Sequence, residues 1–302
     1  MYASGSLVQT CDGAFWYTAG ETGIALGRAA IAAVLAYVPD GSPPDAPQRK
    51  VLTTDEATYL KVHAQSLDNY RALVLARSAL QVPCKVDLGR LVFVDPEKIV
   101  KVVDAQAAVA AWSAHRPDRQ RLLDALCHHL GLNIDALGIS GSTLMFSDLR
   151  DRHELDLVIY GAEASRNAWR RIGECIAAGV FEPIAGYSQR FRLLGIEIDP
   201  QFALKPADGS VLGGVCPIDS RMGEACTATV TCHRMGHFYP AVYETDCGPR
   251  LMSFRFGHRG LFPSGSMIRL PPLPIITFAR SDGSTWEARL LRGEWLALAG
   301  NP

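Results

Sequence analysis

Two acidic residues, Glu154 and Asp156, lead into an apolar run that ends at Tyr160. In an extended strand they occupy positions i and i+2, so both side chains leave the same face of the sheet. Two carboxylates beside an apolar strand are costly unless a positive charge neutralises them. Mg²⁺, which binds through one or two carboxylates together with substrate phosphates, is the natural partner. The alternative is an exposed strand start that carries two solvated acids.

A turn of small residues, Gly141-Ser142, precedes these acids by a short spacer. Backbone N–H groups at such a turn, and at the start of a helix expected over Thr143–Phe146, can bind a phosphate. The Ser142 hydroxyl adds a further donor. By itself a Gly-Ser turn is more typical of an ordinary helix N-cap. The acids that follow are what make it a candidate nucleotide-binding turn.

A third carboxylate comes from a strand predicted over Phe191–Asp199, which ends at Pro200. Glu197 and Asp199 share one face of that strand. We expect the strand to lie antiparallel to the one over Leu155–Tyr160 and to bring one of the two acids to the metal. Asp199 is favoured because it ends the strand. The alternative is that either acid is only a surface residue.

Other reactive side chains give weaker indications of a binding or catalytic site. Three arginines flank the predicted site and are candidates for contact with a triphosphate, although such side chains are usually solvated: Arg170, Arg171 and Arg192. Cys226, Cys232, His233 and His237 lack the paired spacing of a structural zinc site. The chain has 8 cysteines without a CxxC pair, so we expect reduced thiols.

The elements that would position these residues fall into three regions. Residues 1–116 show short β-like stretches, such as Leu91–Val94, and a helical pattern over Lys98–His115. Residues 117–208 alternate helix and strand, with helices over Arg119–Leu130 and Ala162–Ala178. Residues 209–302 contain short strand candidates at 227–232, 241–244, 252–256, 275–279 and 286–291. The sequence therefore predicts an α+β chain with a β-rich N-terminal region, a central mixed sheet with flanking helices, and a small C-terminal β-barrel-like domain.

Composition narrows the function classes. The chain has 302 residues, of which 48% are hydrophobic and 20% charged, as in a globular protein. Lys and Arg (30) nearly balance Asp and Glu (31), so no overall positive field attracts nucleic acid or an anionic membrane. The N-terminus lacks a secretory pattern, and the longest apolar run, Ile24–Val38, is interrupted by Arg28 and too short to span a bilayer. We expect a cytoplasmic protein with no membrane partner.

The turn and the acids together resemble the signature of the DNA polymerase β nucleotidyltransferase superfamily, which is Gly-Ser, a spacer, and then carboxylate-hydrophobic-carboxylate-hydrophobic. Leu137–Ser142 and Glu154–Gly161 are similar to the sequences of a poorly characterised group of archaeal and bacterial predicted nucleotidyltransferases. The likeness covers most of the chain, because flanking segments also resemble those of that group: Gln9–Gly13, Ala36–Asp40 and Phe238–Tyr243. The group usually has Asp where this chain has Glu154, whose extra methylene moves the oxygens by roughly a bond length.

The resemblance implies a polymerase β-type core that transfers a nucleoside monophosphate from an NTP to a hydroxyl acceptor and releases pyrophosphate. Glu154, Asp156 and Asp199 would be the catalytic ligands of Mg²⁺ or Mn²⁺, and Gly141 and Ser142 would bind the nucleotide. The acceptor stays open between a small molecule, a protein side chain and an RNA or DNA end. An OB-like C-terminal surface for nucleic acid would use Arg250, Phe254, Arg255 and Arg259. The rival is a non-catalytic nucleotide- or nucleic-acid-binding protein that retains the fold.

Overall fold

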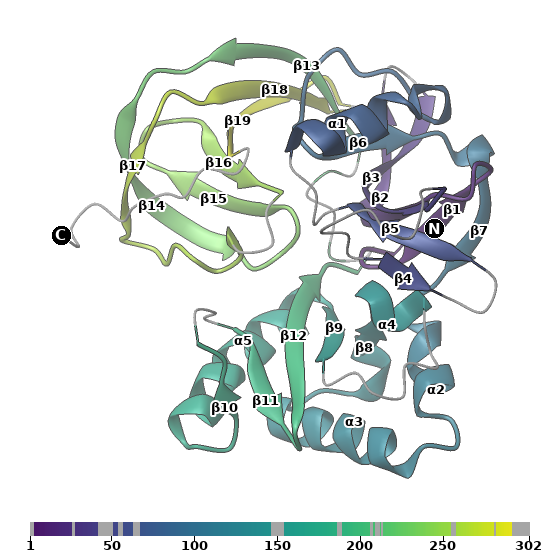
Figure 1. The fold of residues 1–302 in the computed structure, drawn as a ribbon. Coiled ribbons are helices and arrows are strands. Elements are labelled where there is room, and N and C mark those ends of the chain that lie inside the picture. The colour runs from purple at the N-terminus through teal and green to yellow at the C-terminus, as the bar shows by residue number, and fades with distance from the viewer. Residues whose placement is uncertain are drawn as a thin grey trace.

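The computed structural model describes residues 3–25, 28–41, 51–53, 57–62, 67–145, 154–185, 189–205, 208, 212, 214–254, 258–280 and 282–291. The chain is a mixed α+β protein, mostly sheet with few helices, and its strands form three sheets (Figure 1). None of the helices in these ranges has the length and apolar character of a segment that crosses a membrane.

The first sheet has the strand order β4-β5-β3-β2-β1-β7, with β6 also paired to β3. Helix α1 (Leu67–Leu75) lies against it, and the hydroxyl of its Tyr70 accepts the Leu35 N–H at 3.1 Å in the core. Its strands are β1 (Leu7–Thr10), β2 (Phe15–Ala25), β3 (Arg28–Pro39), β4 (Val51–Thr53), β5 (Thr58–Lys61), β6 (Leu91–Val94) and β7 (Ile99–Val103).

The second sheet has the order β10-β11-β12-β9-β8, with β8 antiparallel and β12 parallel to β9. Helices α3 and α5 contribute to one core with Leu155 and Leu157, so they cover that face of β9. The elements are α2 (Ala107–Ser113), α3 (Pro117–Leu130), β8 (Leu137–Ile139), α4 (Gly141–Met145), β9 (Glu154–Tyr160), α5 (Ala162–Ala177), β10 (Glu182–Pro183), β11 (Phe191–Leu193) and β12 (Ile196–Ala203).

The two long helices form as the sequence predicts. Pro117 begins α3, because its fixed φ and missing N–H suit the first helical turn. The leucines at 122, 123, 126 and 130 are buried along one stripe. Gly131, with φ of 66°, ends α3 in the left-handed region, which only glycine enters without a steric penalty. The predicted strand over Leu155–Tyr160 and the helix from Ala162 are confirmed as well.

Four predictions about the elements are wrong. The helix expected over Lys98–His115 is strand β7 followed by α2, because the valine-rich Ile99–Val103 pairs with β1 at the sheet edge. The single strand expected over Phe191–Asp199 is the hairpin β11–β12, which turns at Leu194-Gly195. Because this hairpin reverses the chain, β12 runs parallel to β9 rather than antiparallel. It also continues through Pro200 to Ala203, so Asp199 does not end the strand.

The third sheet has the order β13-β18-β19-β16-β15-β14-β17 and curves into a half-barrel (Figure 1). The C-terminal strand predictions are confirmed, except that β16 ends at Ser253, before Phe254; β13 and β17 were missed. Residues 255 and 256 lie outside the described residues. Its strands are β13 (Val215–Met222), β14 (Cys226–Met235), β15 (Ala241–Thr245), β16 (Arg250–Ser253), β17 (Met267–Leu270), β18 (Pro274–Arg280) and β19 (Thr285–Leu291).

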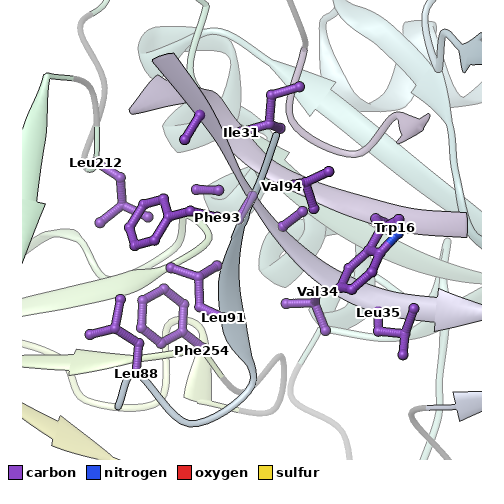
Figure 2. Packing of buried hydrophobic residues seen from close by; sticks show 14 of the residues in the cluster. Trp16, Ile31, Val34, Leu35, Leu88, Leu91, Phe93, Val94, Leu212 and Phe254 are labelled. Atoms are coloured by element: carbon purple, nitrogen blue, oxygen red, sulfur yellow. The ribbon is translucent and has the colours of Figure 1, made fainter. Parts of the chain in front are cut away.

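The first sheet shares a hydrophobic core with each of the other two. Figure 2 shows Phe93 and Leu91 of β6 beside Leu212 and Phe254, which belong to the C-terminal part. On the other side, Tyr37 of β3 belongs to one cluster with residues of the second sheet, including Val158, Tyr160 and Ala203. The N-terminal sheet is therefore the packing centre of the molecule.

Candidate active site

The parallel pairing of β9 and β12 places four carboxylates side by side. Glu154 is the register neighbour of Glu197, and Asp156 is the register neighbour of Asp199. Neighbours in register point to the same face, and alternate residues along a strand share it. The sequence proposed Glu154, Asp156 and Asp199 as one group, and all three lie at this junction.

This face of the sheet is the one turned toward the N-terminal sheet. Asp156 alternates with Val158 and Tyr160, whose side chains are buried in the cluster shared with β1, β2 and β3. Leu155 and Leu157 point the other way, into the helical core. The carboxylates therefore lie at the border between two sheets, where water is partly excluded.

Arg190, just before β11, binds three of the four carboxylates. Its Nη2 lies 2.6 Å from Asp199 Oδ2, and its Nη1 lies 3.4 Å from Glu197 Oε1 and 3.5 Å from Glu154 Oε1. The side chains of Arg190 and Glu154 are 25% and 49% exposed. This cation is largely covered by protein but still reaches solvent at the edge of the site.

Arg259 binds Asp199 from the opposite side and is held more firmly. Its Nη2 lies 3.6 Å from Asp199 Oδ1, and its Nη1 donates to the Pro200 carbonyl at 3.2 Å. The Arg259 carbonyl in turn accepts a hydrogen bond from the side-chain amide of Gln189. Arg259 is buried, so a charge left without Asp199 there would be costly.

Asp156 has the most perturbed carboxyl group of the site. Burial, followed by the like charges of Asp199 and Glu154, raises its pKa to about 7, against the opposing effect of Lys61 and Arg190. Within the described residues no basic side chain forms an ion pair with Asp156. When ionised, Asp156 lies among other acids, so a cation that binds there relieves their mutual repulsion.

Gly141 lies directly against the Asp156 carboxylate. Its φ is +61°, and a Cβ placed on it would come within 1.8 Å of Asp156 Oδ2. The preceding Ser140 N–H donates to the Asp156 carbonyl at 2.9 Å, which fixes the turn beside β9. Ser142 is buried in the short helix α4. The two sequence motifs, separated along the chain, thus meet in space.

The N-terminal sheet also reaches this site. The Tyr17 hydroxyl of β2 donates to Gln201 of β12 and lies 3.0 Å from the Ser140 hydroxyl. Burial raises the pKa of Tyr17, and the charges of Asp156 and Asp199 act in the same direction. Tyr17 therefore stays a neutral phenol that connects β12 to the turn before Gly141.

The arginines that the sequence placed near a triphosphate are engaged elsewhere. Arg170 pairs with Glu174 one turn along α5, and Arg171 Nε donates to the His129 carbonyl at 2.7 Å. Arg192 pairs with Glu182 across the β10–β11 hairpin at 2.8 Å. Sequence reasoning missed the basic residues that the fold brings to the carboxylates instead: Lys61, Arg190 and Arg259.

The residues proposed for an OB-like surface are not gathered on one face. Phe254 is buried in the core shared with the first sheet, and Arg259 is buried beside Asp199. Arg250 stacks over Trp286, with 5.2 Å from its guanidinium carbon to the ring centroid. Arg255 lies outside the described residues.

The carboxylates of the site can be compared with the ligands that a divalent metal ion requires. Within the described residues, no three or more His, Cys, Asp or Glu side chains are grouped to hold a metal ion by themselves. Mg²⁺ does not require such a cage, because it binds through one or two carboxylates and completes its shell with substrate phosphates and water. Asp156, with hard oxygen donors and a raised pKa beside a glycine turn, fits that mode of binding.

Neither a protein-family model, nor a curated protein, nor a solved structure matches this chain.

Proposed function

We propose that the chain is a metal-dependent nucleotidyltransferase that moves a nucleoside monophosphate from an NTP to a hydroxyl acceptor and releases pyrophosphate. One observation carries the proposal: the Asp156 carboxylate, with a pKa of about 7, lies between its register neighbour Asp199 and the close-approach glycine Gly141. Carboxylates beside a backbone cradle suit a triphosphate that arrives with its metal. The order of β8, α4 and β9, with β12 parallel to β9, supports a polymerase β-type core.

In this proposal Glu154 and Asp156 hold Mg²⁺ or Mn²⁺, with Asp199 helping at the ion near the acceptor oxygen. Backbone N–H groups at Gly141 and Ser142 hold the β- and γ-phosphates. When bound, the metal lowers the pKa of the acceptor hydroxyl and neutralises charge on the leaving pyrophosphate. The acceptor oxygen forms a bond to the α-phosphorus. The bond between the α-phosphorus and the oxygen that bridges it to the β-phosphorus breaks, and pyrophosphate leaves.

Arg190 and Arg259 have different parts in the same proposal. Arg259 stays on Asp199 because its guanidinium is buried and fixed by the Pro200 carbonyl. Arg190, which is partly exposed, transfers from the carboxylates to phosphate oxygens when the nucleotide and metal enter. The exchange keeps the charge balanced, because the incoming metal replaces the guanidinium beside the carboxylates.

The acceptor we propose is a small molecule or a protein side chain. The net charge is −1, so a long polyanion gains little from the overall field. Phe254 and Arg259, which were candidates for an RNA or DNA end, are buried and used in other contacts. A polynucleotide end is the weaker acceptor proposal.

The test of the activity is pyrophosphate release from a mixture of NTPs and candidate acceptors. We expect release that depends on Mg²⁺ or Mn²⁺ and stops with a chelator, with transfer of nucleotide mass to the acceptor seen by mass spectrometry. The same divalent ion should strengthen binding of a non-hydrolysable NTP, because unneutralised carboxylates repel the triphosphate. Equal NTP affinity with and without metal would contradict the proposed site.

A second candidate function is a non-catalytic nucleotide-binding protein with the same core. The observation that favours it is the ion-pair network, in which Arg190 and Arg259 already neutralise Asp199 and Arg190 also binds Glu154. Such a protein would bind nucleotide without releasing pyrophosphate. Binding of a non-hydrolysable NTP together with no turnover over any acceptor tested would favour this candidate.

The length of the side chain at position 154 should matter for an active enzyme. Glu154 is half-exposed at the start of β9 and reaches Arg190, so Glu154→Asp pulls the carboxylate back from its partners. A misplacement of about 1 Å in a catalytic group can cost up to about 100-fold in rate, so we expect turnover to fall by roughly 10- to 100-fold. Steady-state pyrophosphate release measures this, with unchanged thermal stability as the control for folding. Turnover equal to the wild type would remove Glu154 from the catalytic group.

A further inference from the structure

Two cysteines of the third sheet, Cys226 and Cys247, lie side by side. Their Sγ atoms are 4.0 Å apart, with the Cys226 thiol directed at the Cys247 sulfur. Cys226 is the first residue of β14, and Cys247 lies in the turn between β15 and β16. They are 21 positions apart in the chain, so the strand pairing brings them together. Both side chains are partly buried and both thiols are free.

Hydrogen bonds hold the turn of Cys247 against the strand of Cys226. The Asp246 N–H donates to the Thr229 carbonyl at 3.0 Å, and the Thr229 N–H donates to Asp246 Oδ1 at 2.7 Å. Because Thr229 belongs to β14, these bonds anchor the turn to the same strand that carries Cys226. The two sulfurs are therefore positioned by a sheet rather than by a loose loop.

A third group orients the Cys247 thiol. The Thr245 hydroxyl lies 3.3 Å from Cys247 Sγ and donates its proton to the Pro249 carbonyl at 3.0 Å. A hydroxyl has one proton, so toward the sulfur Thr245 acts as an acceptor. The thiols thus form a chain of contacts that runs from Cys226 through Cys247 to Thr245.

Other cysteines of the chain give a contrast. The Cys84 thiol donates to the Val86 carbonyl at 3.4 Å, and the Cys216 thiol lies 3.7 Å from the Pro217 carbonyl. A disulfide needs sulfurs about 2 Å apart, so Cys226 and Cys247 must approach each other by about 2 Å. In the contact between Cys226 and Cys247 each sulfur already faces another sulfur.

We propose that Cys226 and Cys247 form a redox-active dithiol that closes to a disulfide by reaction with a small disulfide such as oxidised glutathione. The Cys247 thiolate attacks one glutathione sulfur and releases the first glutathione thiolate. Cys226 then loses its proton and attacks Cys247 Sγ in the mixed disulfide, which releases the second glutathione. The protein loses two electrons and two protons, and the S–S bond of the oxidant is reduced to two thiols.

The order of attack follows from the surroundings of the two thiols. Burial, followed by the neighbouring Cys247 thiol, raises the pKa of Cys226, which keeps it protonated longer as the pH rises. The Cys226 thiol donates toward Cys247 Sγ, and a donor in this position favours the thiolate on Cys247. Cys247 is therefore the first nucleophile, and Cys226 is the residue that resolves the mixed disulfide. This site is independent of the carboxylates on β9 and β12.

The test uses the folded, full-length protein. It is incubated with oxidised glutathione, its remaining thiols are alkylated, and its peptides are mapped by mass spectrometry. We expect a peptide pair that joins Cys226 to Cys247 and the loss of both residues from the alkylated pool. We also expect a rise in melting temperature of roughly 5 °C or more, because a cross-link restricts the unfolded chain. A thiol reductant should reverse both changes.

Variants identify the two roles. Cys226→Ser should stop the reaction at the first step, with one glutathione retained on Cys247. Cys84→Ser is the matched control, because it removes another partly buried thiol and should leave the cross-link intact. The proposal is overturned if wild-type Cys226 and Cys247 both stay alkylatable while the exposed Cys11 takes up glutathione. That wild-type result decides the question even if Cys226→Ser fails to fold.

Discussion

Asp156→Asn is expected to lower nucleotidyl transfer by about 1000-fold or more, which corresponds to roughly 4 kcal/mol of transition-state stabilisation. The substitution keeps the shape of the side chain and its place beside Gly141 but removes the negative charge that holds the metal. Pyrophosphate release with a confirmed acceptor measures the loss. Turnover that is unchanged in Asp156→Asn would end the case for catalysis at this site.

The same substitution should make the metal-free protein more stable at neutral pH. The folded-state pKa of Asp156 is about 7 and its ordinary value is 3.8, so between these pH values the unfolded chain is ionised while the folded chain keeps its proton. The free energy of unfolding therefore falls by an amount on the order of 2–4 kcal/mol as the pH rises from about 4 to about 7. Above that pH it levels off. Asp156→Asn removes this loss.

Urea unfolding at pH 4.5 and at pH 8 measures the effect of Asp156→Asn on stability. We expect the variant to exceed the wild type in stability at pH 8 and to differ little from it at the lower pH. Added Mg²⁺ should raise the melting temperature of the wild type more than that of the variant, because metal bound only by the folded state stabilises it. A variant that is less stable at pH 8 would show that the carboxylate has a favourable structural partner.

Gly141→Ala should remove NTP binding while the rest of the fold persists. The added Cβ would lie 1.8 Å from Asp156 Oδ2 in a residue with φ of +61°, so the turn and the carboxylate cannot both keep their positions. Left-handed backbone alone costs a residue with a Cβ roughly 1–2 kcal/mol. The collision adds to this cost, and it displaces the N–H groups proposed to hold phosphate. Titration calorimetry with a non-hydrolysable NTP and Mg²⁺ measures the loss of affinity.

Gly179→Ala is the matched control for the backbone effect. Gly179 ends α5 with φ of +71°, and a Cβ placed there meets no atom within 4 Å. It should therefore lower stability by the conformational cost alone and leave NTP affinity as in the wild type. If Gly141→Ala also binds NTP with wild-type affinity, the proposed phosphate cradle is wrong.

The sequence predicted the local elements of the site well. Strand β9 and helices α3 and α5 are governed by the periodicity of their own apolar residues, which a single chain reveals. The placement of Asp199 was harder, because it depended on the short turn at Leu194-Gly195. Leu194 has φ of +51°, an unusual conformation for a residue with a Cβ, so no common turn pattern marked the hairpin.

The same turn explains why Arg190 was missed. In the hairpin, Phe191 pairs with Ile198 and Arg192 pairs with Glu197, so continuation of this register puts Arg190 opposite Asp199. A hairpin interpretation would have predicted the ion pair, whereas a continuous strand separates the two residues. Unlike Arg190, Tyr17 and Arg259 could not be placed at the site from the sequence. Their partners lie more than 50 positions away, and no local pattern connects them.

The central position of the N-terminal sheet affects how the chain folds during synthesis. Its core contains residues from both ends of the chain, such as Val8 of β1 and Leu290 of β19. Domains that emerge early from the ribosome usually fold before the rest is made. Here the part of the apolar face that packs against the third sheet cannot be fully buried until β19 has been translated. That part of the apolar surface therefore stays exposed while the residues between β7 and β19 are being translated.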